Sequence, residues 1–144
     1  MKSGSRKTRE ILPFALLALS FLLRGSAAAL VPLGVSEKEA ASGKAAEVNN
    51  HGVELFQQGE FFDALVHFVA SSQMDPTLWK YHYNCAVVLS AAGNVEEARV
   101  HLDRSRKIDP DNPEMRRYHA ALLQEINQNT MGGGRPSPPE GEGR

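Results

Sequence analysis

The sequence of 144 residues contains a single cysteine, Cys85, and this scarcity excludes two classes of small protein. One thiol cannot form an intramolecular disulfide, so no disulfide framework holds the chain together. It also supplies too few sulfur ligands for a cysteine-based zinc site. We interpret Cys85 as a small buried apolar residue, because the alternative, a redox thiol, requires an electropositive and partly exposed setting.

Sequence motifs for catalysis, phosphate binding and metal binding are also missing. The only glycine run begins at Gly132, near the end of the chain, and the serines and histidines do not occur in a nucleophile motif. Among the five histidines, His67 and His101 are 34 residues apart and are expected on neighbouring helices about 10 Å apart, too far to share an ion. We therefore expect no enzymatic activity, no cofactor and no bound metal.

Neither sign of charge dominates the chain, which has 16 basic and 17 acidic residues. Nucleic-acid binding needs a basic surface that neutralises phosphates. The composition therefore argues against a nucleic-acid partner.

The longest apolar run, residues 11–23, is too short to cross about 30 Å of hydrocarbon as a helix. Basic residues precede it, and Ala27-Ala28-Ala29 follows it, which is the pattern of a secretory signal peptide over residues 1–29. Cleavage after Ala29 would leave a periplasmic or secreted protein with a net charge of −5. The alternatives are an uncleaved membrane anchor over residues 11–35 and an organelle transit peptide.

Two further segments stand outside the central sequence. Residues 30–44 are expected to form a linker or a short lead-in helix, since Ser36 and Glu39 have the spacing of a capping box. Residues 129–144 are rich in glycine, proline and charge, which predicts a disordered tail.

The central sequence contains an internal repeat. The ending SSQMDP at residues 71–76 returns as SRKIDP at residues 105–110, and residues 45–78 align with residues 79–112 without a gap. The ten identical pairs are Asn50/Asn84, Val53/Val87, Leu55/Leu89, Gly59/Gly93, Ala64/Ala98, Val66/Val100, His67/His101, Ser71/Ser105, Asp75/Asp109 and Pro76/Pro110. A fixed period of about 34 residues is typical of helix–turn–helix solenoids.

The residue types within each repeat fit that architecture. Gly59 and its repeat equivalent suit a turn that needs positive φ, Ala64 suits a close helix contact, and Asp-Pro ends each unit. The chain thus resembles the tetratricopeptide repeat (TPR) family over roughly residues 45–128. It departs from the family pattern in the first helix of each unit, where Val48 and His82 replace a large aromatic residue.

This resemblance implies an all-α fold, a short TPR solenoid of antiparallel helix pairs. The repeats span residues 45–78 and 79–112, and a capping helix spans residues 113–128. The five expected helices cover residues 45–58, 61–73, 78–91, 95–107 and 112–127. Two repeats are fewer than the three usually needed for stability. Either the cap and the lead-in segment suffice, or the chain self-associates or docks on a larger partner.

The resemblance also implies a concave groove that binds a peptide. Asn84 stands where TPR proteins that bind chaperone tails use an asparagine to grip a terminal carboxylate, but Glu114 replaces a lysine of that set and would repel a carboxylate. The alternative is that Asn84 is a repeat-packing residue, since Asn50 recurs at the same place. The concave face is expected to present Tyr83 as an exposed aromatic platform, together with the amide of Asn84 and the cations of Lys80 and Arg117. The expected groove residues are Asn49, Val53, Phe56, Lys80, Tyr83, Asn84, Val87, Arg117, Ala121 and Gln124.

We therefore expect a non-enzymatic protein–protein interaction module, exported, that binds a peptide or a partner helix in its groove. The alternative is a small structural or assembly subunit of an envelope-associated complex, stabilised by docking of its open apolar face. The sequence does not identify the protein partner.

Overall fold

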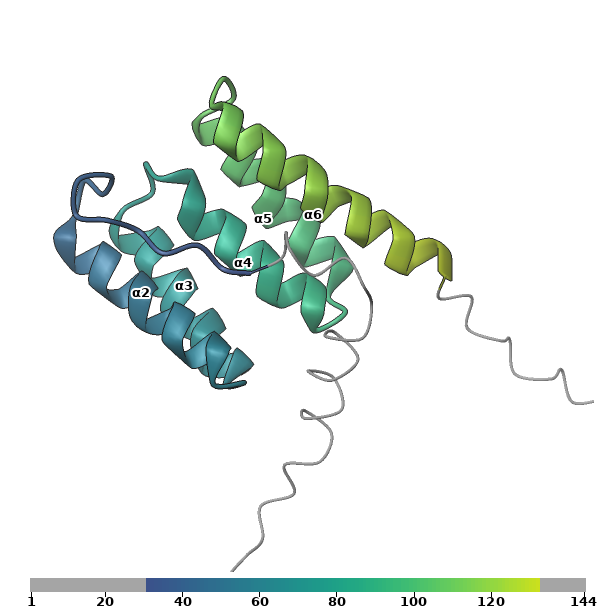
Figure 1. Cartoon of the computed structure of the whole chain (residues 1–144), viewed down its shortest axis with the longest axis horizontal. Coiled ribbons are helices and arrows are strands. Elements are labelled where there is room, and N and C mark those ends of the chain that lie inside the picture. The colour runs from purple at the N-terminus through teal and green to yellow at the C-terminus, as the bar shows by residue number, and fades with distance from the viewer. Residues whose placement is uncertain (1–30, 133–144) are drawn as a thin grey trace, which may run out of the picture.

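A computed structural model describes residues 31–132 of the chain (Figure 1). The expected signal peptide, residues 1–29, lies outside the described residues, and so do most of the alternative membrane anchor and the tail beyond residue 132.

The described residues form five α-helices and contain no strand. This confirms the all-α fold that the repeat predicts, with small differences at the helix ends. The last helix continues to Gly132, so residues 129–132 are helical rather than part of a disordered tail. The helices are α2 (Gly43–Gln57), α3 (Phe61–Met74), α4 (Trp79–Ala91), α5 (Val95–Ile108) and α6 (Pro113–Gly132).

The helices stack as antiparallel pairs along one direction. α2 packs on α3 and α4 packs on α5, while α3 against α4 joins the two pairs (Figure 1). α6 covers α5 and part of α4 at the far end of the stack. This is the arrangement of a short helical solenoid with a closing helix.

Equivalent glycines make the turn within each pair. Gly59 and Gly93 have φ values of 83° and 82°, a region that glycine adopts without steric cost. The turn is closed in both repeats by the same backbone hydrogen bond, from Glu60 to Leu55 and from Asn94 to Leu89, at 2.9 Å each. The repeat in the sequence is therefore a repeat in backbone conformation.

An asparagine precedes both α5 and α6, but only one of the two caps its helix. The side chain of Asn94 makes no capping hydrogen bond at α5, although Glu96 and Glu97 lie in the first turn, where acidic residues favour the helix dipole. Asn112 caps α6, since its Oδ1 accepts hydrogen bonds from the amides of residues 114 and 115 at 2.9 and 3.0 Å.

Small residues let the paired helices approach closely. A Cβ atom added at Gly52 of α2 would lie 2.8 Å from the ring of Phe68 on α3. Ala64 and its repeat equivalent Ala98 are fully buried. α4 is buried along almost its whole length, because it contacts the first pair, its own partner helix and α6. The core therefore centres on α4.

Candidate functional site

Residues 31–41, which we call the strap, run along the stack before α2 begins (Figure 1). The strap contains no helix, so the expectation of a linker describes it and the lead-in helix does not form. Ser36 and Glu39 close a turn instead: the amide and hydroxyl of Ser36 donate to the Glu39 carboxylate at 3.0 and 2.8 Å. Capping-box spacing therefore produces a turn here.

Asparagine side chains hold the backbone of the strap. The amide N–H of Leu33 donates to Oδ1 of Asn84 at 2.7 Å, and Nδ2 of Asn84 donates to the Leu33 carbonyl at 2.8 Å. Asn50 holds Val35 in the same two-bond manner, with both distances 2.8 Å. Nδ2 of Asn49 also donates to the Leu33 carbonyl at 3.0 Å, and Oδ1 of Asn49 accepts from Nδ2 of Asn84 at 2.8 Å.

These contacts place an extended polypeptide across α4 and α2. Asn50 and Asn84 are equivalent residues of the two repeats, and they hold strap residues that are two positions apart. Alternate residues of an extended chain face the same side. The step from one repeat to the next therefore corresponds to two residues of the strap. We call the surface of α2 and α4 under the strap the inner face.

A small apolar pocket on the inner face receives one strap side chain. Val35 is 4% exposed and packs with Ala45, Ala46 and Tyr81. Burial raises the pKa of Tyr81 to about 12, and the carboxylates of Asp75 and Glu39 add to this effect. Among the described residues, no hydrogen-bond partner reaches the buried Tyr81 hydroxyl.

A cation on the inner face binds an acidic strap residue. Nζ of Lys80 lies 2.6 Å from the carboxylate of Glu39, and Glu114 lies on its other side at 3.8 Å. The hydrogen bond from Lys80, with those from Ser36, lowers the pKa of Glu39 to about 2. The strap then joins α2 near Asp75, which accepts the amide of Ala41 at 3.0 Å.

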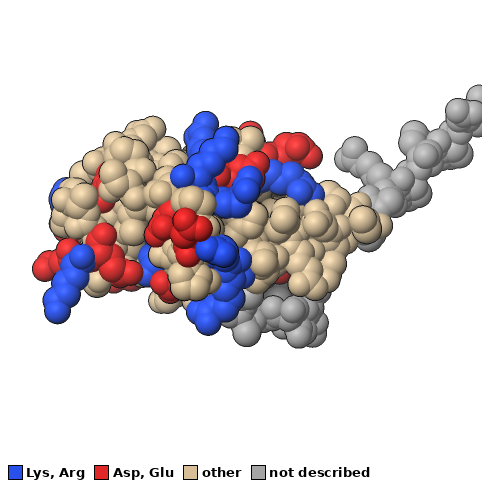
Figure 2. Space-filling view, turned by 90° about the horizontal axis from the view of Figure 1, so that it is seen from above, with Lys and Arg blue, Asp and Glu red and all other residues tan. Residues whose placement is uncertain are grey.

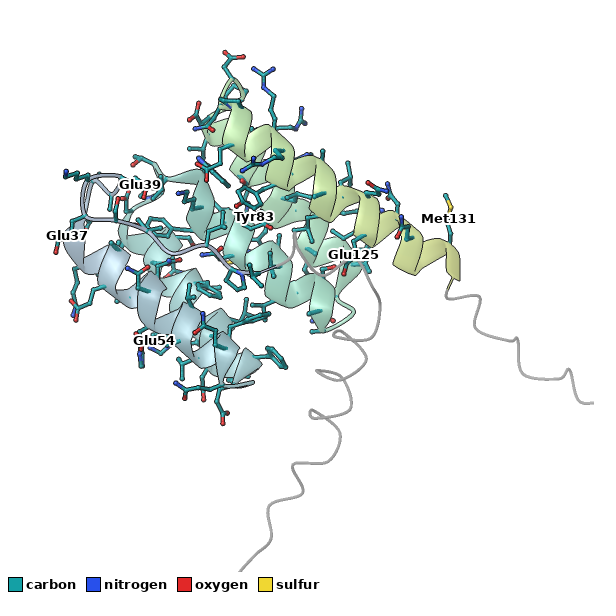
Figure 3. All side chains as sticks on the ribbon, viewed as in Figure 1. Glu37, Glu39, Glu54, Tyr83, Glu125 and Met131 are labelled. Carbon is teal, nitrogen blue, oxygen red and sulfur yellow. The ribbon has the colours of Figure 1, made fainter. Side chains whose placement is uncertain are left out.

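The strap is open to solvent along its α2 side. Figure 3 shows Glu37 and Glu54 on that side of the molecule, whereas Glu39 lies at the turn of the strap. A hollow borders the strap there, and it is lined by Val35, Glu37, Gly43, Ala46, Glu47, Asn50, His51 and Glu54.

The comparison with protein families agrees with this architecture. A model of the tetratricopeptide repeat matches residues 55–122, from the end of α2 into α6. The chain is a TPR protein. No curated protein and no solved structure matches it. TPR repeats generally mediate protein–protein interaction and are typically non-enzymatic modules.

In this TPR protein the strap contacts three of the residues expected to line a groove. Asn49 and Asn84 are fully buried beneath the strap, and Lys80 is 7% exposed beside its turn. Asn84 pairs with the backbone of an internal residue, Leu33, whereas the asparagine at this position in TPR proteins that bind chaperone tails grips a terminal carboxylate.

The other expected groove residues have different surroundings. Tyr83 is fully buried between Trp79 and Tyr118, with ring centroids 6.1 and 5.4 Å away (Figure 3), so the expectation of an exposed platform is wrong. Arg117 is exposed and lies over the Tyr118 ring at 5.3 Å. Val87 is buried, Val53, Phe56 and Ala121 are half-buried, and Gln124 is exposed.

Sequence reasoning missed the most important occupant of the site, the strap itself. It also missed Ala45, Ala46 and Tyr81, which form the pocket for Val35. The recurrence of Asn50 at the Asn84 position was a usable signal, since both residues form the same hydrogen bonds with the strap backbone.

Histidine and cysteine contacts are local within this TPR protein. The rings of His67 and His51 meet edge to face with centroids 4.8 Å apart, and Nδ1 of His101 lies 3.3 Å from Nδ1 of His82. Each of the two repeat-equivalent histidines thus contacts a histidine of its own helix pair. Between residues 31 and 132, no cluster of three potential ligands could hold a metal ion. Cys85 is fully buried, and burial raises the pKa of its thiol to about 12.

The surface of the described residues carries both signs of charge. Figure 2 shows basic and acidic side chains interspersed on one face, without a continuous basic surface on that face. None of the helices in the described range is long and apolar enough to span a bilayer.

Proposed function

We propose that this TPR protein binds an extended segment of a partner protein on its inner face, through asparagine side chains that pair with the backbone of that segment. The observation that carries the proposal is the pairing of Asn84 with Leu33 and of Asn50 with Val35. A primary amide that both donates to a carbonyl and accepts from an N–H pairs with both backbone polar groups of one residue. Such pairing recognises any extended backbone, whatever its side chains.

The burial of these asparagines supports a binding role over a packing role. A buried amide without hydrogen-bond partners costs about 1–3 kcal/mol, so a segment that covers Asn49 and Asn84 has to offer backbone partners to them. In the described structure the strap supplies that partner. The inner face is thus built to hold a polypeptide, and the strap occupies it.

The competing function, an assembly subunit, depends on an open apolar face at the end of the solenoid. Met115, Leu122 and Ile126 of α6 are fully buried and cover the second repeat. The α6 end of the solenoid is therefore closed, which favours peptide binding over docking through that end.

We also infer that the protein acts after export, with cleavage near Ala29. The support is the order of basic residues, short apolar run and small residues in positions 1–29. Its partner would then be periplasmic or extracellular.

Peptide binding to the full-length chain tests the proposal. The probe is a fluorescent peptide of residues 31–41 with both ends blocked, and the chain carries Val35→Asp, since an aspartate in the apolar pocket weakens the strap. We expect this chain to bind the peptide. Adding Asn50→Ala should weaken the binding by about tenfold, because two hydrogen bonds to the peptide backbone are lost.

Arg104→Ala is the control, because Arg104 is exposed on α5 and no strap contact involves it. Binding that is equally strong with Asn50→Ala and with Arg104→Ala would contradict the proposed function.

A further inference from the structure

We propose that the partner segment carries two side-chain determinants: an apolar residue two positions after the residue held by Asn84, and an acidic residue six positions after it. The strap presents this pattern itself, with Leu33, Val35 and Glu39. The inference rests on the proposed function and adds the class of ligand to it. The strap is then an intramolecular competitor that the partner displaces.

The ligand is an internal segment rather than a chain terminus. Asn84 uses both the N–H and the carbonyl of Leu33, and Asn49 also donates to that carbonyl. A C-terminal residue in the place of Leu33 has no residue after it, so Asn50 would have no backbone to hold.

The apolar determinant follows from the size of its pocket. Two alanines and the ring of Tyr81 surround Val35, which is almost completely buried there. A branched aliphatic side chain fills this space, whereas a charged one would lose its hydration without a partner. The pocket therefore selects residues similar to valine.

The acidic determinant follows from the surroundings of Lys80. The side chain of Lys80 is only 9% exposed, and a buried ammonium is unfavourable unless a negative group stays beside it. Glu39 supplies that group at 2.6 Å. A partner that displaces the strap removes Glu39 and leaves Lys80 with only the more distant carboxylate of Glu114, at 3.8 Å. An acidic residue of the partner would restore the closer ion pair.

The strap is an imperfect occupant, which makes displacement feasible. It leaves the Tyr81 hydroxyl without a described partner, and Gly34 between its two anchored residues is exposed. A hollow lies beside it, so an incoming segment can reach its edge. Its advantage is its attachment to α2, which gives it a high effective concentration.

A double-mutant cycle on the full-length chain tests the pattern. The chain carries Val35→Asp, with and without Lys80→Gln, and the probes are the blocked peptide of residues 31–41 and its Glu39→Gln version. We expect the parent peptide to bind Val35→Asp at least about tenfold tighter than the unmodified chain, because the strap no longer competes. The Glu39→Gln peptide should bind Val35→Asp about fivefold more weakly than its parent.

The Lys80→Gln chain should bind both peptides equally, and its melting temperature reports whether it is folded. If it does not fold, Lys80→Arg replaces it, and the preference for the acidic peptide should persist. Equal binding of the two peptides to Val35→Asp would overturn the acidic determinant. If Asn50→Ala still weakened the binding of both peptides, the proposed function would stand. Binding that Asn50→Ala leaves unchanged would contradict the proposed function itself.

The oligomeric state separates a partner from a second copy of the chain. We expect the unmodified protein to be monomeric by light scattering, with its strap on its own inner face. A dimer that dissociates with Val35→Asp would overturn the proposal, because it would assign the inner face to the strap of another copy.

Discussion

Lys80 and Glu39 are 41 residues apart in the sequence, and their charged groups lie 2.6 Å apart in the structure. This contact fastens the turn of the strap to α4, next to the asparagine pairs that hold the strap backbone. Glu39 keeps a side-chain exposure of 39%, so the contact can exchange with solvent or with a competitor. It links the charge of one strap residue to the occupancy of the inner face.

Acid should loosen the strap through Glu39. The pKa of Glu39 is lowered from 4.5 to about 2 with the strap bound, so bound strap is favoured above pH 4.5 and this contribution is lost as the pH falls toward 2. We expect Trp79, the only tryptophan, to report the change by fluorescence, since Nζ of Lys80 lies 5.8 Å from its ring.

The matched control is Glu39→Gln, which cannot titrate. Asp75 also has a lowered pKa, because hydrogen bonds from Thr77 and from the backbone outweigh its burial, and it titrates in both proteins. An identical fluorescence titration with and without Glu39→Gln would show that another group releases the strap.

Tyr83 should contribute to folding rather than to partner binding. Its ring is fully buried against two other aromatic rings, so Tyr83→Ala should lower the free energy of unfolding by about 3–5 kcal/mol. Arg117→Ala, at an exposed position, should change it by no more than about 0.5 kcal/mol. Urea unfolding measures both, and equal stability of the two variants would contradict the burial of Tyr83.

Gly52 should tolerate no side chain. A Cβ atom there would lie 2.8 Å from Phe68 Cε1 and 3.1 Å from His67 Cβ, so Gly52→Ala should destabilise the protein by about 1–3 kcal/mol. Gly43→Ala is the control, since no atom lies within 4 Å of its added Cβ and Gly43 is the first residue of α2, where alanine should be neutral or slightly stabilising. Thermal unfolding that shifts in the same direction for both would refute close packing of α2 on α3.

Export should remove the first 29 residues. The small residues before Leu30 suit a signal peptidase, so the mature N-terminus should be at or near Leu30, just before the strap. Intact-mass measurement of protein from its native host tests this. Detection of residues 11–29 in the membrane fraction would support an anchor instead.

The sequence by itself determined the repeated architecture. The 34-residue period, the turn glycines and the small residues at helix contacts predict two helix pairs and a closing helix, because these features act through local conformation and helix contacts that recur in each unit. The extent of α6 was less predictable, since residues 129–132 have weak helix signals and merely continue the preceding turns.

Only the tertiary structure decided what lies on the inner face. Asn50 and Asn84 recur in the alignment, but their partner is a segment that belongs to neither repeat and has no pattern of its own. The exposure of Tyr83 was equally undetermined, because adjacent sides of α4 meet the strap at Asn84 and α6 near Tyr83. A helical period gives the side of a helix on which a residue lies, whereas the element that covers that side follows from how distant parts of the chain pack.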